Sequence, residues 1–319
     1  VYLKKLFFSM KNSNFLNEAL ADQDDFLTAQ IDVSDQPLVI IFSLPRGAST
    51  LFQQIAISSL DIGYVSNLIA KFWRAPYIGA QLDSSVRDPE YISSFKSSYG
   101  NVVGPQEPHE WGWFWQHWLK LGGNETYCKD KKTLDLVGLR QKLGALQSLW
   151  QRPFLIDSVF AMANYSILED IMPKTLAVHV RRDNYYVCNS HINARIKRHG
   201  NIFEYYGHRP RNIKQILAIK DPIEQIVVQV KSAETEIEKT LLTIEASKIF
   251  QAEYWDLVEQ PQMVMDNFKV FLEGNSGIKI SNRQLPKLNL EFRDGPEFVN
   301  PEYKEKLDTY YELHFGGKS

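Results

Sequence analysis

Cysteine, net charge and long apolar runs are all scarce in this sequence. Its 319 residues include only Cys128 and Cys188, with no Cys-x-x-Cys pair, so neither a disulfide framework nor a cysteine-rich zinc site is supported. The 36 Lys and Arg nearly balance the 38 Asp and Glu, which leaves no global positive field for binding duplex nucleic acid. The longest strongly apolar stretch, Pro37 to Leu44, is far shorter than the ~18–20 residues that span a bilayer. We therefore expect a soluble protein that binds no nucleic acid and has no membrane span.

The same features bear on compartment and domain organisation. Few thiols favour a reducing compartment, and we predict a cytoplasmic protein. No signal peptide is recognisable, although a start at Val1 instead of Met is compatible with removal of an N-terminal segment. The length favours one domain, 1–319, with a core over about 38–272 and a C-terminal arm or tail over about 275–319.

Buried strands alternate with helices along the chain. Leu38–Phe42 is a continuous β-branched and aromatic run, typical of a strand buried on both faces, and shorter or similar runs occur at Phe154–Ile156 and Leu176–Val180. Each is followed by polar residues and then by helical spacing. Downstream, the apolar spacing predicts an amphipathic helix over Glu234–Phe250 and another over 261–274. This order predicts an α/β fold, with a parallel β-sheet flanked by helices on both faces.

The loop after the first strand has the composition of an anion site. It reads Pro-Arg-Gly-Ala-Ser-Thr over residues 45–50 and opens a helix, where unpaired backbone N–H groups and the positive end of the helix dipole meet. The small residues Gly47 and Ala48 allow an anion to approach the backbone closely. The hydroxyls of Ser49 and Thr50 can donate hydrogen bonds, and the guanidinium of Arg46 adds a positive charge. The motif G-x-x-x-x-G-K-[ST] is absent, which disfavours an ATPase or GTPase.

A second loop, after the strand at Leu176–Val180, carries Arg182 and, eight residues later, Ser190. Arg182 can form a bidentate, charge-assisted contact with an anion, and Ser190 can donate a hydroxyl hydrogen bond. Together the two loops resemble the two signatures of the sulfotransferases that use 3′-phosphoadenosine 5′-phosphosulfate (PAPS). The resemblance spans about Leu38 to Leu272 and implies a P-loop-like sulfotransferase fold with PAPS as co-substrate and no metal.

The resemblance also implies a role for each loop. In the family, the first signature holds the 5′-phosphosulfate and stabilises the leaving group, which here would fall to Arg46 with the backbone of Gly47, Ala48, Ser49 and Thr50. The second signature holds the 3′-phosphate, which here would fall to Arg182 and Ser190.

Two residues depart from the family pattern. Ala48 stands where the family usually has Gly, so the loop fits only if Ala48 keeps a negative φ or the turn relaxes. Asp157 stands where many relatives have a Lys that contacts the phosphosulfate, and an acidic group beside an anionic donor is unfavourable unless it is protonated or paired. Asp157 could instead bind Arg152 or act as a base.

Transfer to a hydroxyl also needs a general base. The carboxylate and imidazole group formed by Glu107, His109 and Glu110 is the best source, with Glu110 preferred and His109 second. The segments over residues 69–76 and 105–115 resemble a bacterial branch of the family. The four tryptophans between residues 111 and 118 either fill the core or wall an acceptor pocket, since Trp faces suit sugars and apolar acceptors.

Three functions remain open at this point. The leading hypothesis is a PAPS-dependent sulfotransferase that acts on a hydroxyl of a carbohydrate, glycolipid or secondary metabolite. A nucleotide kinase-like phosphoryl transferase would need a Lys in the phosphate loop and acidic Mg²⁺ ligands at strand ends, and that Lys is missing. A non-catalytic nucleotide-binding member of the fold is the third, prompted by Ala48 and Asp157. The sequence identifies neither the acceptor nor the oligomeric state.

Overall fold

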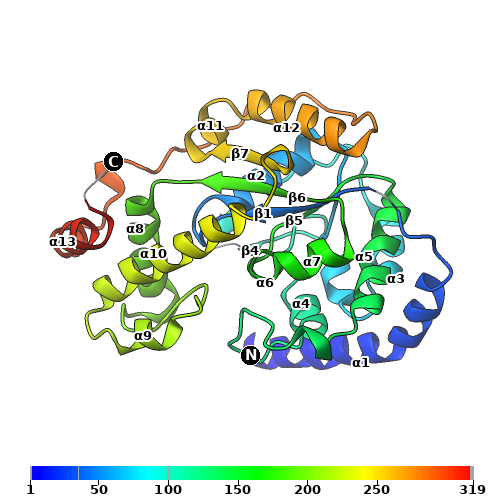
Figure 1. The fold of residues 1–319 in the computed structure, drawn as a ribbon, viewed down its shortest axis with the longest axis horizontal. Coiled ribbons are helices and arrows are strands. Elements are labelled where there is room, and N and C mark those ends of the chain that lie inside the picture. The colour runs from blue at the N-terminus through cyan, green and yellow to red at the C-terminus, as the bar shows by residue number, and fades with distance from the viewer. Residues whose placement is uncertain (1, 35, 99–100, 317–319) are drawn as a thin grey trace.

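A five-stranded parallel sheet forms the centre of the molecule (Figure 1), in the order β2-β5-β1-β6-β7. The computed structural model describes residues 2–34, 36–98 and 101–316, and the side chains of these except 2–13, 98 and 101. Residues 1 and 317–319, the ends of the predicted domain, lie outside this range. The strands of the sheet are β1 (Leu38–Phe42), β2 (Gly63–Tyr64), β5 (Phe154–Ile156), β6 (Thr175–Arg181) and β7 (Ile249–Glu253), and a separate antiparallel pair is β3 (Ser97–Ser98) and β4 (Asn101–Val102).

Helices cover both faces of the sheet (Figure 1). In chain order they are α1 (Tyr2–Thr28), α2 (Ser49–Ser59), α3 (Pro76–Val86), α4 (Gly112–Trp118), α5 (Leu136–Trp150), α6 (Val159–Ala163), α7 (Tyr165–Ile171), α8 (Asn184–His199), α9 (Ile213–Ala218), α10 (Pro222–Leu241), α11 (Tyr254–Glu259), α12 (Pro261–Ser276) and α13 (Lys304–Phe315). Short 3₁₀ helices are η1 (Ile69–Phe72), η2 (Lys131–Thr133), η3 (Ala246–Lys248) and η4 (Pro296–Phe298). None of the helices, over the described residues, is long and apolar enough to cross a membrane.

The alternation of side chains along β1 explains the layers. Leu38, Ile40 and Phe42 point into a core shared with α4, α5, α7, α8 and α10, whereas Val39 and Ile41 point into a core shared with α2, α11 and α12. All five residues are buried, because a strand at the centre of a parallel sheet has helices on both sides. The predicted α/β class, with a parallel sheet between helical layers, is confirmed.

The predicted elements agree with the structure with one exception. The three buried runs form β1, β5 and β6, and the helix expected over 261–274 is α12. The helix expected over Glu234–Phe250 is correct only as far as Leu241, where α10 ends, because residues 249–253 form β7. Strand β7 pairs with β6, so backbone hydrogen bonding to the edge of the sheet overrides the helical spacing of apolar residues.

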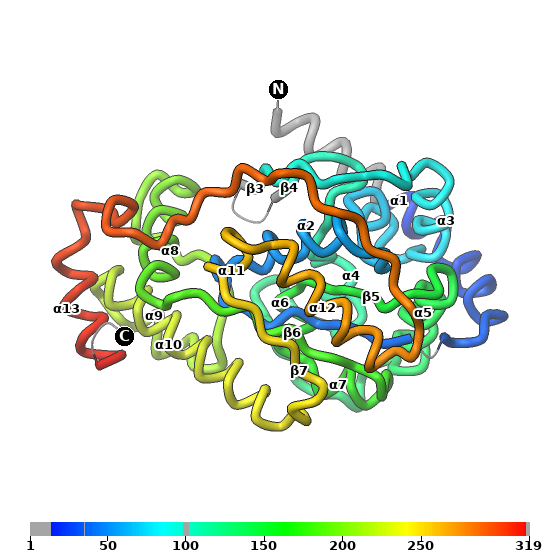
Figure 2. Tube along the Cα trace, turned by 90° about the horizontal axis from the view of Figure 1, so that it is seen from above, coloured from blue at the N-terminus to red at the C-terminus, as the bar shows by residue number. Residues whose placement is uncertain are grey.

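The chain between α12 and α13 forms a strap (residues 277–303) that runs across the molecule (Figure 2). Near its start, the backbone N–H of Arg283 donates to the carbonyl of Ser59 at the end of α2 (2.7 Å). Near its end, Asn189 of α8 donates to the carbonyl of Phe298 (2.9 Å). The predicted C-terminal arm or tail therefore includes a segment bound to the body of the protein, followed by α13, which packs against α10.

Candidate functional site

The carboxyl ends of three neighbouring strands meet at one edge of the sheet. Arg46 follows β1, Asp157 follows β5 and Arg182 follows β6. Because β5 and β6 both pair with β1 in parallel, the loops that leave their carboxyl ends lie side by side. Loops far apart in the sequence are thereby brought into one site.

The first loop is a tight turn that leads into α2. The backbone N–H of Gly47 donates to the carbonyl of Leu44 (2.7 Å). A Cβ atom on Gly47 would lie 2.4 Å from Ser43 Oγ, so only glycine fits there. The first turn of α2 has no side-chain cap, which leaves N–H groups at this helix end for another hydrogen-bond acceptor. Ser49 and Thr50 form that turn, so the predicted hydroxyls stand at the helix start.

Ala48 adopts a left-handed conformation, with φ of 78°. Neither of the two expected adjustments therefore occurs: φ is not negative, and the turn retains the geometry that glycine would adopt without strain. The Cβ of a non-glycine residue crowds the backbone in this region, at a cost of roughly 1 kcal/mol.

Replacing Ala48 by glycine should therefore stabilise the protein. We expect Ala48→Gly to raise the free energy of unfolding by about 1 kcal/mol in urea denaturation, since the strain disappears. Ala56→Gly, in the buried middle of α2, is the matched control and should lower it by about 1 kcal/mol or more. A destabilised Ala48→Gly would contradict the assignment of strain to this residue.

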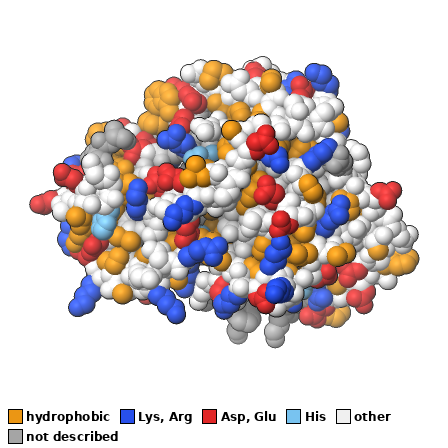
Figure 3. All heavy atoms as spheres, viewed as in Figure 1, with side chains coloured by type: hydrophobic (Ala, Val, Ile, Leu, Met, Phe, Trp, Pro, Cys, Tyr) orange, Lys and Arg blue, Asp and Glu red, His pale blue; other side chains and the backbone are white. Residues whose placement is uncertain are grey.

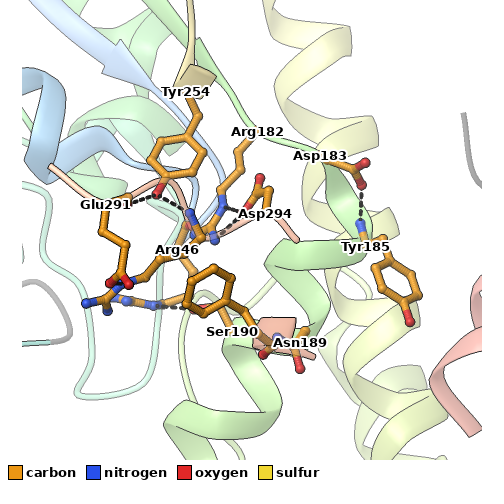
Figure 4. Close-up of polar contacts among 11 residues, drawn as sticks. Arg46, Arg182, Asp183, Tyr185, Asn189, Ser190, Tyr254, Glu291 and Asp294 are labelled. Atoms are coloured by element: carbon orange, nitrogen blue, oxygen red, sulfur yellow. Dashed lines mark hydrogen bonds and ion pairs between the residues drawn. The ribbon is translucent and has the colours of Figure 1, made fainter. Parts of the chain in front are cut away.

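The two arginines predicted to bind phosphates lie next to one another (Figure 4). Arg46 Nε donates to Ser190 Oγ (3.2 Å), and Arg182 Nη1 donates to the carbonyl of Arg46 (2.8 Å). Arg182 also donates through Nε and Nη2 to Oδ1 of Asp294 (2.8 and 2.5 Å) and lies over the ring of Tyr254, 4.6 Å from its centroid. The predicted residues of the two loops thus form one contiguous basic cluster.

Three neighbours of this cluster were not predicted. His191 Nε2 donates to the carbonyl of Pro45 (3.1 Å), which ties α8 to the first loop. Burial, followed by the charges of Arg46 and other neighbours, lowers the pKa of His191 to about 3, so its ring is neutral. Its position beside Ser190 on α8 was the available signal. Only the tertiary structure brings Tyr254 and Asp294 to Arg182.

A carboxyl pair lies beside the first loop. Glu110 and Asp157 line a cavity of about 330 Å³ together with Ser49, whose hydroxyl is hydrogen-bonded to Asp157. Burial and then the Glu110 charge raise the pKa of Asp157 to about 7, against the opposing effect of Ser49. Burial likewise raises the pKa of Glu110, and the nearby Arg46 opposes this. Solvent reaches the Glu110 side chain through the cavity, although many protein atoms lie around its carboxyl group. The pair therefore holds a proton close to neutral pH.

The raised pKa of Asp157 predicts a pH-dependent stability. An acid with a pKa near 3.8 unfolded and about 7 folded favours the folded state while it is protonated, and this contribution is lost as the pH rises from about 4 through about 7. We expect Asp157→Asn, which cannot ionise, to stabilise the protein by roughly 2 kcal/mol at about pH 8 and by little at about pH 4. Chemical denaturation at both pH values measures this; equal effects would contradict the raised pKa.

Two other sequence-based alternatives do not lie in this cavity. Glu107 is buried elsewhere and accepts hydrogen bonds from Ser93 Oγ and the backbone N–H of Ser94, both 2.6 Å. Burial acts to raise the pKa of Glu107, but these hydrogen bonds prevail and lower it. Arg152 binds Asp61 (2.6 Å), so its expected pairing with Asp157 is wrong.

The tryptophan-rich segment divides between core and cavity. Trp111 and Trp115 are buried, whereas Trp113 is 57% exposed. Trp113 lines a second cavity of about 540 Å³ with His109 and Glu110, so Glu110 borders both cavities. His109 Nδ1 accepts a hydrogen bond from the backbone N–H of Trp111 (2.8 Å) and does not line the cavity of Ser49. Trp111 and Trp115 therefore fill the core, as one interpretation of the segment expects, and Trp113 borders a cavity whose ligand stays a prediction.

Charges of both signs are interspersed on the face of the molecule seen in Figure 3. Among the described residues, no group of three or more His, Cys, Asp or Glu side chains is arranged to hold a metal ion. The candidate site thus consists of two arginines, helix N–H groups, hydroxyls and a carboxyl pair.

Comparison with solved structures identifies the fold. The chain is similar to the sulfotransferase STF1 from Mycobacterium tuberculosis H37Rv, with a TM-score of 0.53 and 12% identity over 83% of this chain and 73% of that chain. It is also similar to the sulfotransferase STF9 from Mycobacterium avium, with a TM-score of 0.49 and 12% identity over 80% of this chain and 70% of that chain. A sulfotransferase from Alicyclobacillus acidocaldarius gives a TM-score of 0.46 and 13% identity over 88% of this chain and 93% of that chain. No protein-family model and no curated protein matches the sequence. The protein has the sulfotransferase fold, as expected, and this assignment rests on the first comparison.

Proposed function

We propose that the protein is a sulfotransferase that moves a sulfuryl group from PAPS to a hydroxyl acceptor. One observation carries the proposal: Arg46 meets both Ser190 (Nε to Oγ, 3.2 Å) and Arg182 (carbonyl to Nη1, 2.8 Å), although the first and second loops are far apart in the sequence. A nucleotide with phosphates at both the 5′ and 3′ positions needs two adjacent cationic sites. Two anion-binding loops on adjacent strands provide them.

The contacts suggest a role for each group of the first loop. Arg46 and the free N–H groups at the start of α2 would hold the phosphosulfate and stabilise the negative charge that grows on the departing phosphate. The acceptor oxygen would form a bond to sulfur while the bond from sulfur to the bridging phosphate oxygen breaks. The acceptor proton would pass to the carboxyl pair, with Glu110 as the general base.

The carboxyl pair also explains how the acidic Asp157 can lie beside an anionic donor. A fully ionised pair would repel an anionic donor, but the pKa of about 7 keeps one proton on the pair up to neutral pH. The remaining charge lies close to Arg46, which lowers the pKa of Glu110 against the effect of burial. One carboxylate can then serve as base while its neighbour stays neutral.

The acceptor would occupy the two cavities that Glu110 borders. The second cavity, of about 540 Å³, presents the exposed Trp113 together with the polar side chains of His109, Gln116 and Arg198. An aromatic face with hydrogen-bonding groups around it suits a ring that carries several hydroxyls, which favours a carbohydrate or a glycosylated small molecule among the acceptor classes.

The direct assay is transfer of radiolabelled sulfuryl from PAPS to a panel of sugars, glycolipids and phenols. The proposal predicts acceptor-dependent label transfer together with release of 3′-phosphoadenosine 5′-phosphate. Nucleotide binding without transfer to any acceptor would instead favour the non-catalytic alternative. That alternative also predicts that Glu110 can be replaced without any functional consequence.

A second candidate is phosphoryl transfer, and one contact favours it. The Ser49 hydroxyl is hydrogen-bonded to Asp157 at the end of the neighbouring strand β5. In P-loop phosphoryl transferases, a loop Ser or Thr and an Asp on another strand hold Mg²⁺ together. The absence of Lys from residues 45–50 argues against it, because that Lys binds the β- and γ-phosphates. Preferential binding of Mg²⁺–ATP would support this candidate.

We also propose that the protein is cytoplasmic. Cys128 and Cys188 are both free thiols, and Cys188 is buried in α8. Free cysteines favour a reducing compartment, and hence a cytoplasmic protein. Fractionation of the host cell, with detection by antibody, tests this directly.

A further inference from the structure

The strap places a carboxylate on the arginine that would bind the 3′-phosphate. Asp294 Oδ1 accepts from both Nε and Nη2 of Arg182, at 2.8 and 2.5 Å (Figure 4). The two side chains are only 11% and 5% exposed. The Nε–Nη2 edge is a guanidinium edge that a phosphate can grip with two oxygens, and here a carboxylate occupies it.

Two further contacts hold the Arg182 guanidinium in place. Nη1 donates to the carbonyl of Arg46 (2.8 Å), and the plane of the guanidinium lies over the ring of Tyr254. An anion that approaches Arg182 through its Nε–Nη2 edge therefore meets Asp294. A nucleotide 3′-phosphate carries close to two negative charges, so it repels this carboxylate rather than sharing the edge with it.

Near Asp294 the strap is attached by the ring of Phe292, which packs on Tyr254 and Trp255, and by a few hydrogen bonds. The backbone N–H of Arg293 donates to the Tyr254 hydroxyl, which itself donates to the carbonyl of Glu291, both at 3.3 Å. Further along, the N–H of Asn300 donates to Asn189 Oδ1 (2.9 Å). Residues 283–295 contain no helix or sheet strand, so Asp294 can withdraw without the loss of a regular element.

We infer that Asp294 is an internal competitor for the nucleotide 3′-phosphate and thereby determines donor affinity and specificity. The inference rests on the proposed function, because it takes Arg182 as the 3′-phosphate residue. Donor binding exchanges one anion for another on Arg182: the carboxylate leaves with the strap and the phosphate takes its place. A nucleotide without a 3′-phosphate does not compete with Asp294 and leaves the ion pair intact.

Calorimetric titration of two nucleotides into four proteins tests the exchange. The ligands are 3′-phosphoadenosine 5′-phosphate and adenosine 5′-phosphate, and the proteins are the wild type, Asp294→Asn, Arg182→Ala and Glu302→Gln. Glu302 is an exposed carboxylate on the same strap and serves as the matched charge control. We expect Asp294→Asn to bind the bisphosphate at least about tenfold more tightly than the wild type, and to bind adenosine 5′-phosphate unchanged. Glu302→Gln should behave as the wild type.

The outcomes separate this inference from the function on which it rests. If Arg182→Ala weakens bisphosphate binding but Asp294→Asn leaves it unchanged, Arg182 binds phosphate without displacing Asp294, and the inference is wrong while the proposed function stands. If no folded protein of the set binds either nucleotide, both are wrong.

A measurement on the wild type avoids any dependence on the variants. The bisphosphate should increase backbone hydrogen exchange of residues 291–294, because the strap leaves Arg182, whereas adenosine 5′-phosphate should not. Unchanged or slower exchange of this segment with the bisphosphate bound would overturn the inference.

Discussion

Glu110→Gln should slow sulfuryl transfer by roughly 10²–10⁴-fold, the usual contribution of a general base. Glutamine keeps the shape of the side chain but cannot take the proton of the acceptor. Because Glu110 lines the cavities beside the first loop and belongs to neither predicted phosphate-binding loop, nucleotide affinity should stay nearly unchanged. Single-turnover transfer and calorimetric titration measure the two effects separately.

The control for this variant is Glu259→Gln, an exposed carboxylate on α11, which should transfer at the wild-type rate. The pH profile gives a further readout, because transfer by the wild type would depend on a carboxyl pair in which burial raises the pKa of Asp157 to about 7. Full transfer by Glu110→Gln would contradict the assignment of this base, and Asp157 would then become the candidate.

Arg46→Ala should reduce transfer by roughly 10²–10³-fold, or about 3–4 kcal/mol of transition-state stabilisation. Arg46 is the cation of the first loop, so its loss removes the positive charge that would offset the departing phosphate. Arg46→Lys should recover part of the rate, since it restores the charge without the planar fork. Steady-state kinetics with PAPS measure the loss in kcat/KM.

The matched control is Arg140→Ala. Arg140 is exposed on α5 and belongs to neither of the two loops. We expect wild-type kinetics from this variant. Equal losses from Arg46→Ala and Arg140→Ala would mean that general positive charge, rather than the position of Arg46, supports the reaction.

Much of the fold could be predicted because its central strands are largely buried. The runs that form β1 and β5 are wholly apolar, and Leu176–Val180 of β6 is apolar except for His179, as expected for parallel strands at the centre of a sheet. Strand β7 was not predicted, for two reasons. It is a half-exposed strand at the edge of the sheet, and its residues continue the apolar spacing of α10. Its conformation depends on pairing with β6, which the local sequence does not express.

The residues of the candidate site were likewise predictable only in part. Arg46 and Arg182 follow buried strands, so topology brings them to one edge of the sheet, and their adjacency agrees with the sequence-based expectation. Asp294 belongs to a segment without a motif and reaches Arg182 only through the tertiary course of the strap. The proximity of Glu110 to Asp157 likewise depends on a long connection between α2 and β5.

Calorimetric titration of 3′-phosphoadenosine 5′-phosphate into the wild type and Arg182→Ala, with Mg²⁺–ATP as the competing ligand, tests the sulfonucleotide site most directly. We predict saturable binding of the bisphosphate by the wild type, marked weakening in Arg182→Ala and far weaker binding of Mg²⁺–ATP. Tighter binding of Mg²⁺–ATP than of the bisphosphate would contradict a sulfonucleotide site and favour phosphoryl transfer. Absence of bisphosphate binding would contradict the assignment of both loops.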